Sequence, residues 1–93
     1  MTLDELAQLM RFDKPGSGCI EILFSIRDSR FEGCWMGKCW SHERHQHIYW
    51  FGIPGQENDP STYTTFDAFA DAPRFDGRSL RELWPQVVID MID

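Results

Sequence analysis

The sequence predicts an α+β domain: a small antiparallel sheet, made of a three-strand meander plus a C-terminal strand, with an N-terminal helix and two short helices. Three observations predict this class. Apolar residues recur at helical spacing near the start, alternate with a period of two through the middle, and follow two helix-capping patterns near the end. Because 93 residues are too few for two hydrophobic cores, residues 1–93 are expected to form a single domain.

The first element is expected to be a short helix that begins after Thr2. Thr2 followed three residues later by Glu5 is a capping box, and leucines then recur at helical spacing as far as Met10. The helix must end before Lys14–Gly18, because this segment holds one proline and two glycines, which favour a turn.

The middle of the chain is predicted to form the meander. From Cys19 to Ile26, polarity alternates with a period of two, which is typical of a strand. Asp28–Arg30 is the expected hairpin connection to a second strand over Phe31–Trp40. A third strand, His47–Ile53, is rich in β-branched and aromatic residues and ends before a Pro-Gly pair.

The last third is predicted to hold two short helices and the final strand. Gln56–Ser61 has no apolar residue and is expected to be a mobile loop. Thr65 and Ser79 then stand at the N-caps of the two helices. After Pro85, the β-branched residues of Gln86–Asp93 favour a strand, although a helix would also fit this length.

Composition argues against several classes of function. Nine Lys and Arg against 15 Asp and Glu give a net charge of −6, which disfavours direct nucleic-acid binding. Because no apolar run reaches the roughly 18 residues of a membrane span and no signal peptide opens the chain, we expect a cytoplasmic protein without membrane contact. Three cysteines, Cys19, Cys34 and Cys39, are an odd number for a disulfide scaffold and are expected to be reduced.

One cluster has the chemistry of a zinc site. Two thiols and three imidazoles lie within fourteen residues, at Cys34, Cys39, His42, His45 and His47. Thiolate and imidazole are ligands that zinc prefers, and four of the five would close a tetrahedral site. The spacing lacks a C-x2-C pair, and on a strand the two cysteines point to opposite faces unless a bulge shifts the register. We therefore expect no cofactor and keep a zinc-binding domain as the alternative.

Catalytic motifs are absent from the sequence. A thiol and a base would be paired in Cys39 with His42 or Cys34 with His45, but most chains with a few such residues offer similar pairs. The glycines of Gly16–Gly18 precede a strand, whereas a phosphate-binding loop precedes a helix. The protein is therefore not expected to be an enzyme.

The aromatic residues are candidates for binding. Alternation places Trp35 and Trp40 largely on opposite faces of their strand and Trp50 opposite Tyr49, so both faces of the sheet carry large apolar groups. Most such residues belong to a core, in which case one face packs on the helices and Gln56–Asp71 partly covers the other. The alternative leaves Trp35, Trp40 and Trp50 exposed as anchors for a partner protein, a role in which tryptophan is enriched.

Negative charge is concentrated after Gln56. From Glu57 onward, eight acidic residues accompany three arginines, whereas Arg11–His47 holds six basic and five acidic residues. An acidic face would attract a basic partner and speed association, although solubility alone is a competing explanation. The candidate acidic residues are Glu57, Asp59, Asp67, Asp71 and Asp76.

The C-terminal third also resembles known proteins. The run Tyr63–Phe69, then Ala72, and then Phe75–Trp84 with Ile89 and Ile92-Asp93, resembles the end of small uncharacterised proteins of Firmicutes and their phages and mobile elements. This resemblance implies a bacterial or mobile-element protein and brings no catalytic residue. Small acidic proteins of that provenance include CRISPR inhibitors, which occupy basic surfaces of their targets. The expected function is thus a non-catalytic protein-binding domain, an inhibitor or adaptor, with a protein partner.

Overall fold

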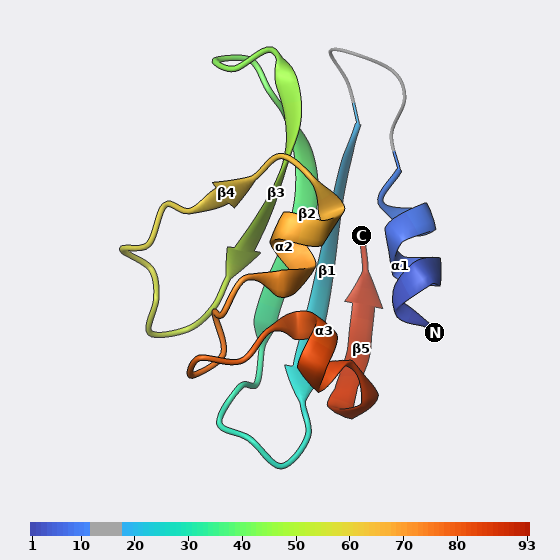
Figure 1. Cartoon of the computed structure of the whole chain (residues 1–93), viewed down its shortest axis with the longest axis vertical. Helices are drawn as coiled ribbons and strands as arrows, with labels where there is room; N and C mark the ends of the chain where they lie inside the picture. The colour runs from blue at the N-terminus through green and yellow to red at the C-terminus, as the bar shows by residue number, and fades with distance from the viewer. Residues whose placement is uncertain (12–17) are drawn as a thin grey trace.

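The structure is a computed structural model that describes residues 1–11 and 18–93. Its elements are α1 (Leu3–Leu9), β1 (Cys19–Ile26), β2 (Cys34–Ser41), β3 (Gln46–Gly52), β4 (Thr62–Tyr63), α2 (Phe66–Asp71), α3 (Leu80–Leu83), the 3-10 turn η1 (Trp84–Gln86) and β5 (Val87–Ile92). The five strands form one antiparallel sheet in the order β4-β3-β2-β1-β5 (Figure 1). The predicted α+β class is confirmed, and β4 is an additional strand. Apart from Gly18, the turn predicted at 14–18 lies outside the described residues.

The three helices begin at the capping residues that the sequence identifies. The Thr2 hydroxyl accepts from the Glu5 N–H at 3.1 Å, and the Glu5 carboxylate accepts from the Thr2 N–H at 2.8 Å. The hydroxyls of Thr65 and Ser79 act in the same way at α2 and α3. Each cap satisfies an N–H group that the first helical turn leaves without a partner. No helix in the described part of the chain is long and apolar enough to cross a membrane.

Strand pairing decides which side chains share a face. In the β1–β2 hairpin Cys19 lies opposite Cys39, and in the β2–β3 hairpin Gly37 lies opposite Trp50. The strand β5 pairs with the other edge of β1, with a shift in register after Leu23. Because successive residues of a strand point to opposite faces, this register separates the side chains of the sheet into two sets.

One face of the sheet carries the hydrophobic core. Alternate residues of β1 to β3 are buried on it, and all three helices contribute to the same cluster. Phe69 of α2 stacks on Phe51 with 4.3 Å between ring centroids, and Phe75 meets Phe51 edge-on at 5.4 Å. In Figure 1, α2 and α3 lie in front of the sheet. The expectation that Gln56–Asp71 partly covers the second face is therefore wrong for α2, because this helix packs on the core face.

Candidate binding face

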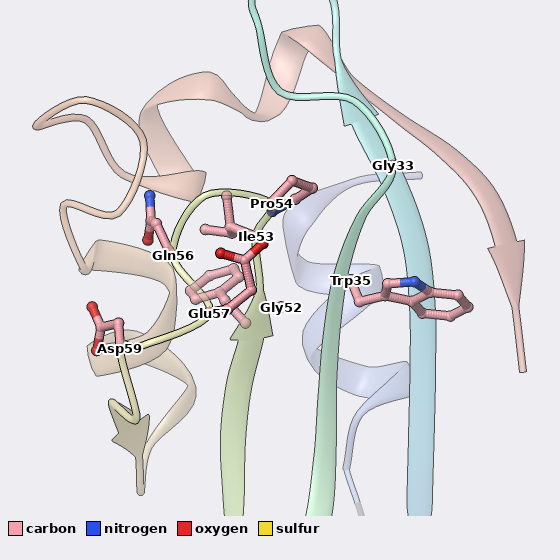
Figure 2. Close-up of a pocket in the computed structure, with 9 residues that line it drawn as sticks. Gly33, Trp35, Gly52, Ile53, Pro54, Gln56, Glu57 and Asp59 are labelled. Atoms are coloured by element: carbon pink, nitrogen blue, oxygen red, sulfur yellow. The ribbon is translucent and has the colours of Figure 1, made fainter.

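The face of the sheet opposite the core has no helix packed on it among the described residues. The buried side chains of all three helices belong to the core cluster, and α1 lies behind the strands when the molecule is viewed from this side (Figure 2). We call this surface the open face. Its apolar side chains are Leu23 of β1, Trp35 of β2, Ile48 and Trp50 of β3, and Val88 and Met91 of β5, with Glu21 and Asp90 beside them.

On the open face, two tryptophans lie opposite two glycines of a neighbouring strand. Trp50 is opposite Gly37, and a β-carbon at Gly37 would lie only 2.5 Å from a ring atom of Trp50. Trp35 is opposite Gly52, where the nearest atom to such a β-carbon is the Trp35 Cβ at 3.4 Å. The Trp50 ring thus lies against the backbone of Gly37, where no side chain covers it. Trp35 and Trp50 are both partly buried.

The third predicted anchor, Trp40, is not part of the open face. Alternation along β2 places it on the opposite side from Trp35, as predicted. Its ring packs edge-on against the ring of His47, its cross-strand partner, with 5.1 Å between centroids. Two of the three predicted tryptophan anchors therefore share one surface.

A hollow of about 440 Å³ adjoins the open face at the ends of β2 and β3 (Figure 2). Phe51 and Ile53, which are 7% and 3% exposed, contribute apolar lining. The Trp35 indole extends towards β1, away from the loop that follows β3 (Figure 2). The other walls come from Gly33 and Gly52 on the strands and from Pro54, Gln56, Glu57 and Asp59 in the loop.

The loop after β3 is fastened to the rest of the fold by Arg74, which is 8% exposed. The Arg74 Nε donates to Gln56 Oε1 at 3.0 Å, and Gln56 Nε2 donates to the Arg74 carbonyl at 2.8 Å. The same Nε lies 3.5 Å from Asp59 Oδ2, and Nη1 donates to the Tyr63 hydroxyl at 3.2 Å. Sequence reasoning predicted a mobile loop at Gln56–Ser61, whereas the structure ties this segment down at both Gln56 and Asp59.

Two carboxylates on this loop line the hollow. Glu57 accepts from the Gly55 N–H at 3.0 Å, and this hydrogen bond lowers its pKa. Asp59 accepts from the Ser61 N–H at 2.9 Å, and hydrogen bonding to Ser61 likewise lowers its pKa. Both shifts favour the charged form, so both groups are ionised at neutral pH.

The remaining predicted acidic residues do not extend this surface. Asp67 and Asp71 of α2 both bind Arg81, at 2.8 and 2.6 Å, and Asp76 binds Arg30 at 2.6 Å. Each of these carboxylates already has an arginine beside it. The five candidate residues therefore do not form one uncompensated acidic face, because Asp67 and Asp71 share Arg81, Asp76 pairs with Arg30, and Asp59 contacts Arg74.

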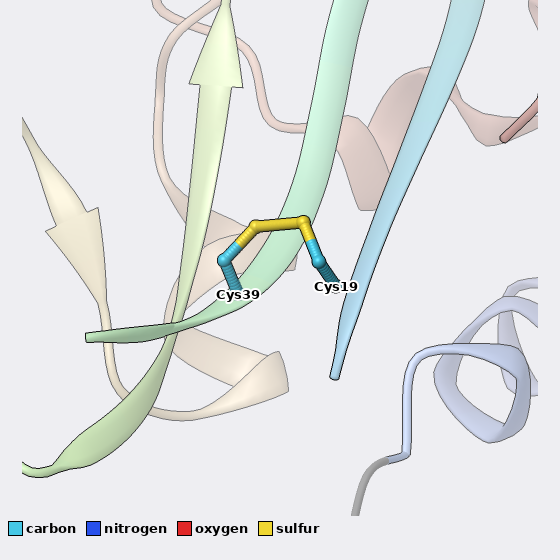
Figure 3. The surroundings of a disulfide bond; sticks show 2 residues. All are labelled: Cys19 and Cys39. Atoms are coloured by element: carbon cyan, nitrogen blue, oxygen red, sulfur yellow. A yellow bond between two sulfur atoms is a disulfide. The ribbon is translucent and has the colours of Figure 1, made fainter. Parts of the chain in front are cut away.

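The cysteines depart from the sequence prediction. Cys19 and Cys39 form a disulfide across β1 and β2, so the expectation that they are reduced is wrong (Figure 3). The sequence does contain a signal for this pairing. A hairpin turn centred on Ser29 places Cys19 and Cys39, ten positions before and after it, opposite each other. Cys34 is the free thiol; it is buried on the core face, and burial raises its pKa to about 11.

The predicted zinc ligands are not brought together. Cys34 lies in the core, the Cys39 sulfur is bonded to Cys19, and His42 and His45 lie in the turn between β2 and β3. Among residues 1–11 and 18–93, no group of three or more His, Cys, Asp or Glu side chains could hold a metal ion. Cys34 and Cys39 are separated by an odd number of positions on β2, so their side chains point to opposite faces of the sheet, as alternation predicts.

The structure brings Trp35, Glu57 and Asp59 together around the hollow and places Trp50 on the same face. Sequence reasoning missed Met91 as a surface residue, because its position depends on the register of β5 against β1. Comparisons with protein-family models, with curated proteins and with solved structures find no match for this chain, so its function is inferred from the open face and the hollow.

Proposed function

We propose that this domain is a non-catalytic module that binds a partner protein through the open face. The observation that carries the proposal is a sheet surface with two partly exposed tryptophans and no helix over it in the described chain. At its edge, Val88 and Met91 are 38% and 47% exposed. Protein interfaces combine an apolar centre, here the two tryptophans, with a polar rim. Tryptophan is also enriched among the residues that dominate binding energy.

The charges around the open face favour a basic partner. Glu21 and Asp90 lie on it, and Glu57 and Asp59 lie beside the hollow. Asp90 accepts a hydrogen bond from the Ser25 hydroxyl at 3.1 Å, while Arg27 at the end of β1 donates to a backbone carbonyl. Complementary charge guides encounter and excludes wrong partners. We therefore propose a partner surface with exposed lysines or arginines.

Within this proposal the domain is an inhibitor or adaptor that occupies a basic surface of its partner. The resemblance of the C-terminal third to proteins of Firmicutes and their phages supports a bacterial or mobile-element setting, and the small size and the net charge of −6 support an inhibitor of this kind. The sequence favours a cytoplasmic location. The Cys19–Cys39 bond argues against that location, because disulfides persist mainly in oxidising compartments.

The experiment compares apolar-to-lysine substitutions on two surfaces. Leu23→Lys and Met91→Lys add positive charge to the open face, and Leu9→Lys makes the same kind of change on α1, where Leu9 is 37% exposed. A partner captured from a bacterial extract is identified, purified and titrated against each variant by calorimetry. We expect the two open-face variants to bind at least about tenfold more weakly, a typical loss where an interface residue contributes to binding, and Leu9→Lys to bind like the original protein. Equal binding by all variants would refute the proposal.

A further inference from the structure

We propose that the hollow beside Trp35 receives an arginine side chain of the partner protein. This inference rests on the proposed function and names the group that the partner inserts next to the open face. It depends on three features of the hollow: its shape, its charge and the way in which its loop is held.

The size and lining of the hollow suit one long side chain. About 440 Å³ lies towards the lower end of the range for ligand pockets, roughly 300–1,000 Å³. Phe51 and Ile53 offer apolar contact to an aliphatic stem, and Pro54 extends that contact along the loop. The absence of a β-carbon at Gly33 and Gly52 leaves room beside the strands. The aliphatic part of a long side chain can therefore pack against apolar surface from the end of β3 to the loop that follows it.

The charge of the hollow selects a cationic head. Glu57 and Asp59 are exposed carboxylates that their own hydrogen bonds keep ionised. Asp59 is shared with Arg74, whereas Glu57 accepts its hydrogen bonds from backbone N–H groups, those of Gly55 and of Glu57 itself, which carry no full charge. Glu57 is therefore the main partner for an incoming cation. An anion would be repelled, and a purely apolar group would leave the carboxylates without compensation.

Arginine fits this arrangement better than lysine. Its guanidinium is planar, is less strongly hydrated than an ammonium group, and can bind a carboxylate through two parallel hydrogen bonds. A guanidinium group therefore loses less hydration free energy than an ammonium group when it enters a hollow whose lining is partly apolar. The reciprocal Gln56–Arg74 hydrogen bonds also hold the loop before the partner arrives. Little conformational entropy then remains to be lost on binding.

The test uses a short blocked peptide, acetyl-Gly-Arg-Gly-amide, titrated into the 15N-labelled 93-residue chain and followed by NMR. Matched peptides carry citrulline, a neutral analogue of arginine, or lysine. We expect the arginine peptide to shift the amides of Gly33, Gly52 and Gly55 in a saturable way, lysine to bind more weakly, and citrulline to leave these amides unchanged. Raising the salt concentration should weaken the arginine response.

Variants then locate the charge that is responsible. Glu57→Gln should weaken the arginine peptide by roughly two- to fivefold, the range that exposed ion pairs produce. Glu43→Gln makes the same substitution in the turn between β2 and β3, at the other end of these strands from the hollow, and should leave the titration unchanged. Equal shifts with citrulline, equal losses in both variants, or no saturable shift at these amides would overturn the inference.

The peptide titration is independent of the partner experiment. If the arginine peptide fails to bind but Leu23→Lys still abolishes partner binding, the open face functions without this hollow and only the further inference is wrong. If the peptide binds as expected but the open-face variants retain the partner, the hollow binds arginine and the proposed function is wrong.

Discussion

The two faces of the sheet hold their aromatic residues in different surroundings. On the core face a ring meets another ring, as where Phe69 stacks on Phe51 at 4.3 Å between centroids. On the open face, Trp50 instead meets the bare backbone at Gly37. Phe69 is fully buried and Phe51 is 7% exposed, whereas Trp50 is only partly buried. The contrast shows that coverage by a helix, more than the aromatic residue itself, decides whether a ring of this sheet is fully buried.

The largest expected effect tests the core face. Phe69 is fully buried and stacks on both Phe51 and Tyr49, so Phe69→Ala leaves a cavity between α2 and the sheet. We expect the free energy of unfolding, measured with urea, to fall by about 3–5 kcal/mol. This is much of the total stability of a small domain, which is about 5–15 kcal/mol. A loss below about 1 kcal/mol would show that α2 does not pack on this face.

The next effect concerns the Cys19–Cys39 disulfide, which alternation along β1 and β2 places on the same side of the sheet as the open face. The Cys19–Cys39 bond closes a loop between residues 20 positions apart, which restricts the unfolded chain. Replacing both cysteines by serine should lower the free energy of unfolding by about 2–4 kcal/mol. A reducing agent should destabilise the original protein to a similar extent and have no effect on the double variant. Three free thiols in unreduced, denatured protein would contradict the bond.

A matched pair of glycines tests the tryptophan contacts. At Gly37 an added β-carbon would lie 2.5 Å from both the Ile20 carbonyl oxygen and the Trp50 ring, whereas at Gly52 the nearest atom is at 3.4 Å. Gly37→Ala should therefore cost about 1–3 kcal/mol through overpacking, and Gly52→Ala should change stability by less than about 0.5 kcal/mol. Denaturation curves followed by tryptophan fluorescence would measure both. Similar costs at the two sites would refute this account of the open face.

The smallest expected effect is chemical and concerns Cys34. Burial on the core face raises the pKa of this thiol to about 11, so the reactive thiolate is scarce at pH 7.4. Iodoacetamide should modify Cys34 about a hundredfold more slowly in the native protein than in urea, and the native rate should rise with pH towards 11. Mass spectrometry of timed samples gives both rates. Rapid native modification at pH 7.4 would place Cys34 outside the core.

Much of the fold could be predicted from the sequence because local signals agree with the final structure. The capping residues Thr2, Thr65 and Ser79 each begin a helix in the structure. Alternation in Cys19–Ile26 and β-branched residues after Pro85 correctly predicted two strands. The two-residue strand β4 was missed, because its pairing with β3 depends on tertiary position rather than on a periodic pattern.

The candidate site could be predicted only in part. Alternation correctly separated Trp35 from Trp40, but it does not say which face the helices will cover. The hollow depends on Arg74, which holds the loop from 18 residues away. The pairing of Asp76 with Arg30, 46 residues apart, is likewise invisible in the sequence. The pairing of Asp67 and Asp71 with Arg81, 14 and 10 residues away, depends in the same way on how α2 and α3 pack together.

Two neighbouring residues of β1 test the central claim, that one face is buried and the other is free for a partner. Ile22 is fully buried on the core face, and Leu23 points to the open face. The decisive measurement is the free energy of unfolding, from urea denaturation, of Ile22→Lys and Leu23→Lys. We expect Ile22→Lys to lose at least about 4 kcal/mol or to unfold, and Leu23→Lys to stay within about 1 kcal/mol of the original protein. If Leu23→Lys unfolds to the same extent as Ile22→Lys, the second face is buried and the account is contradicted.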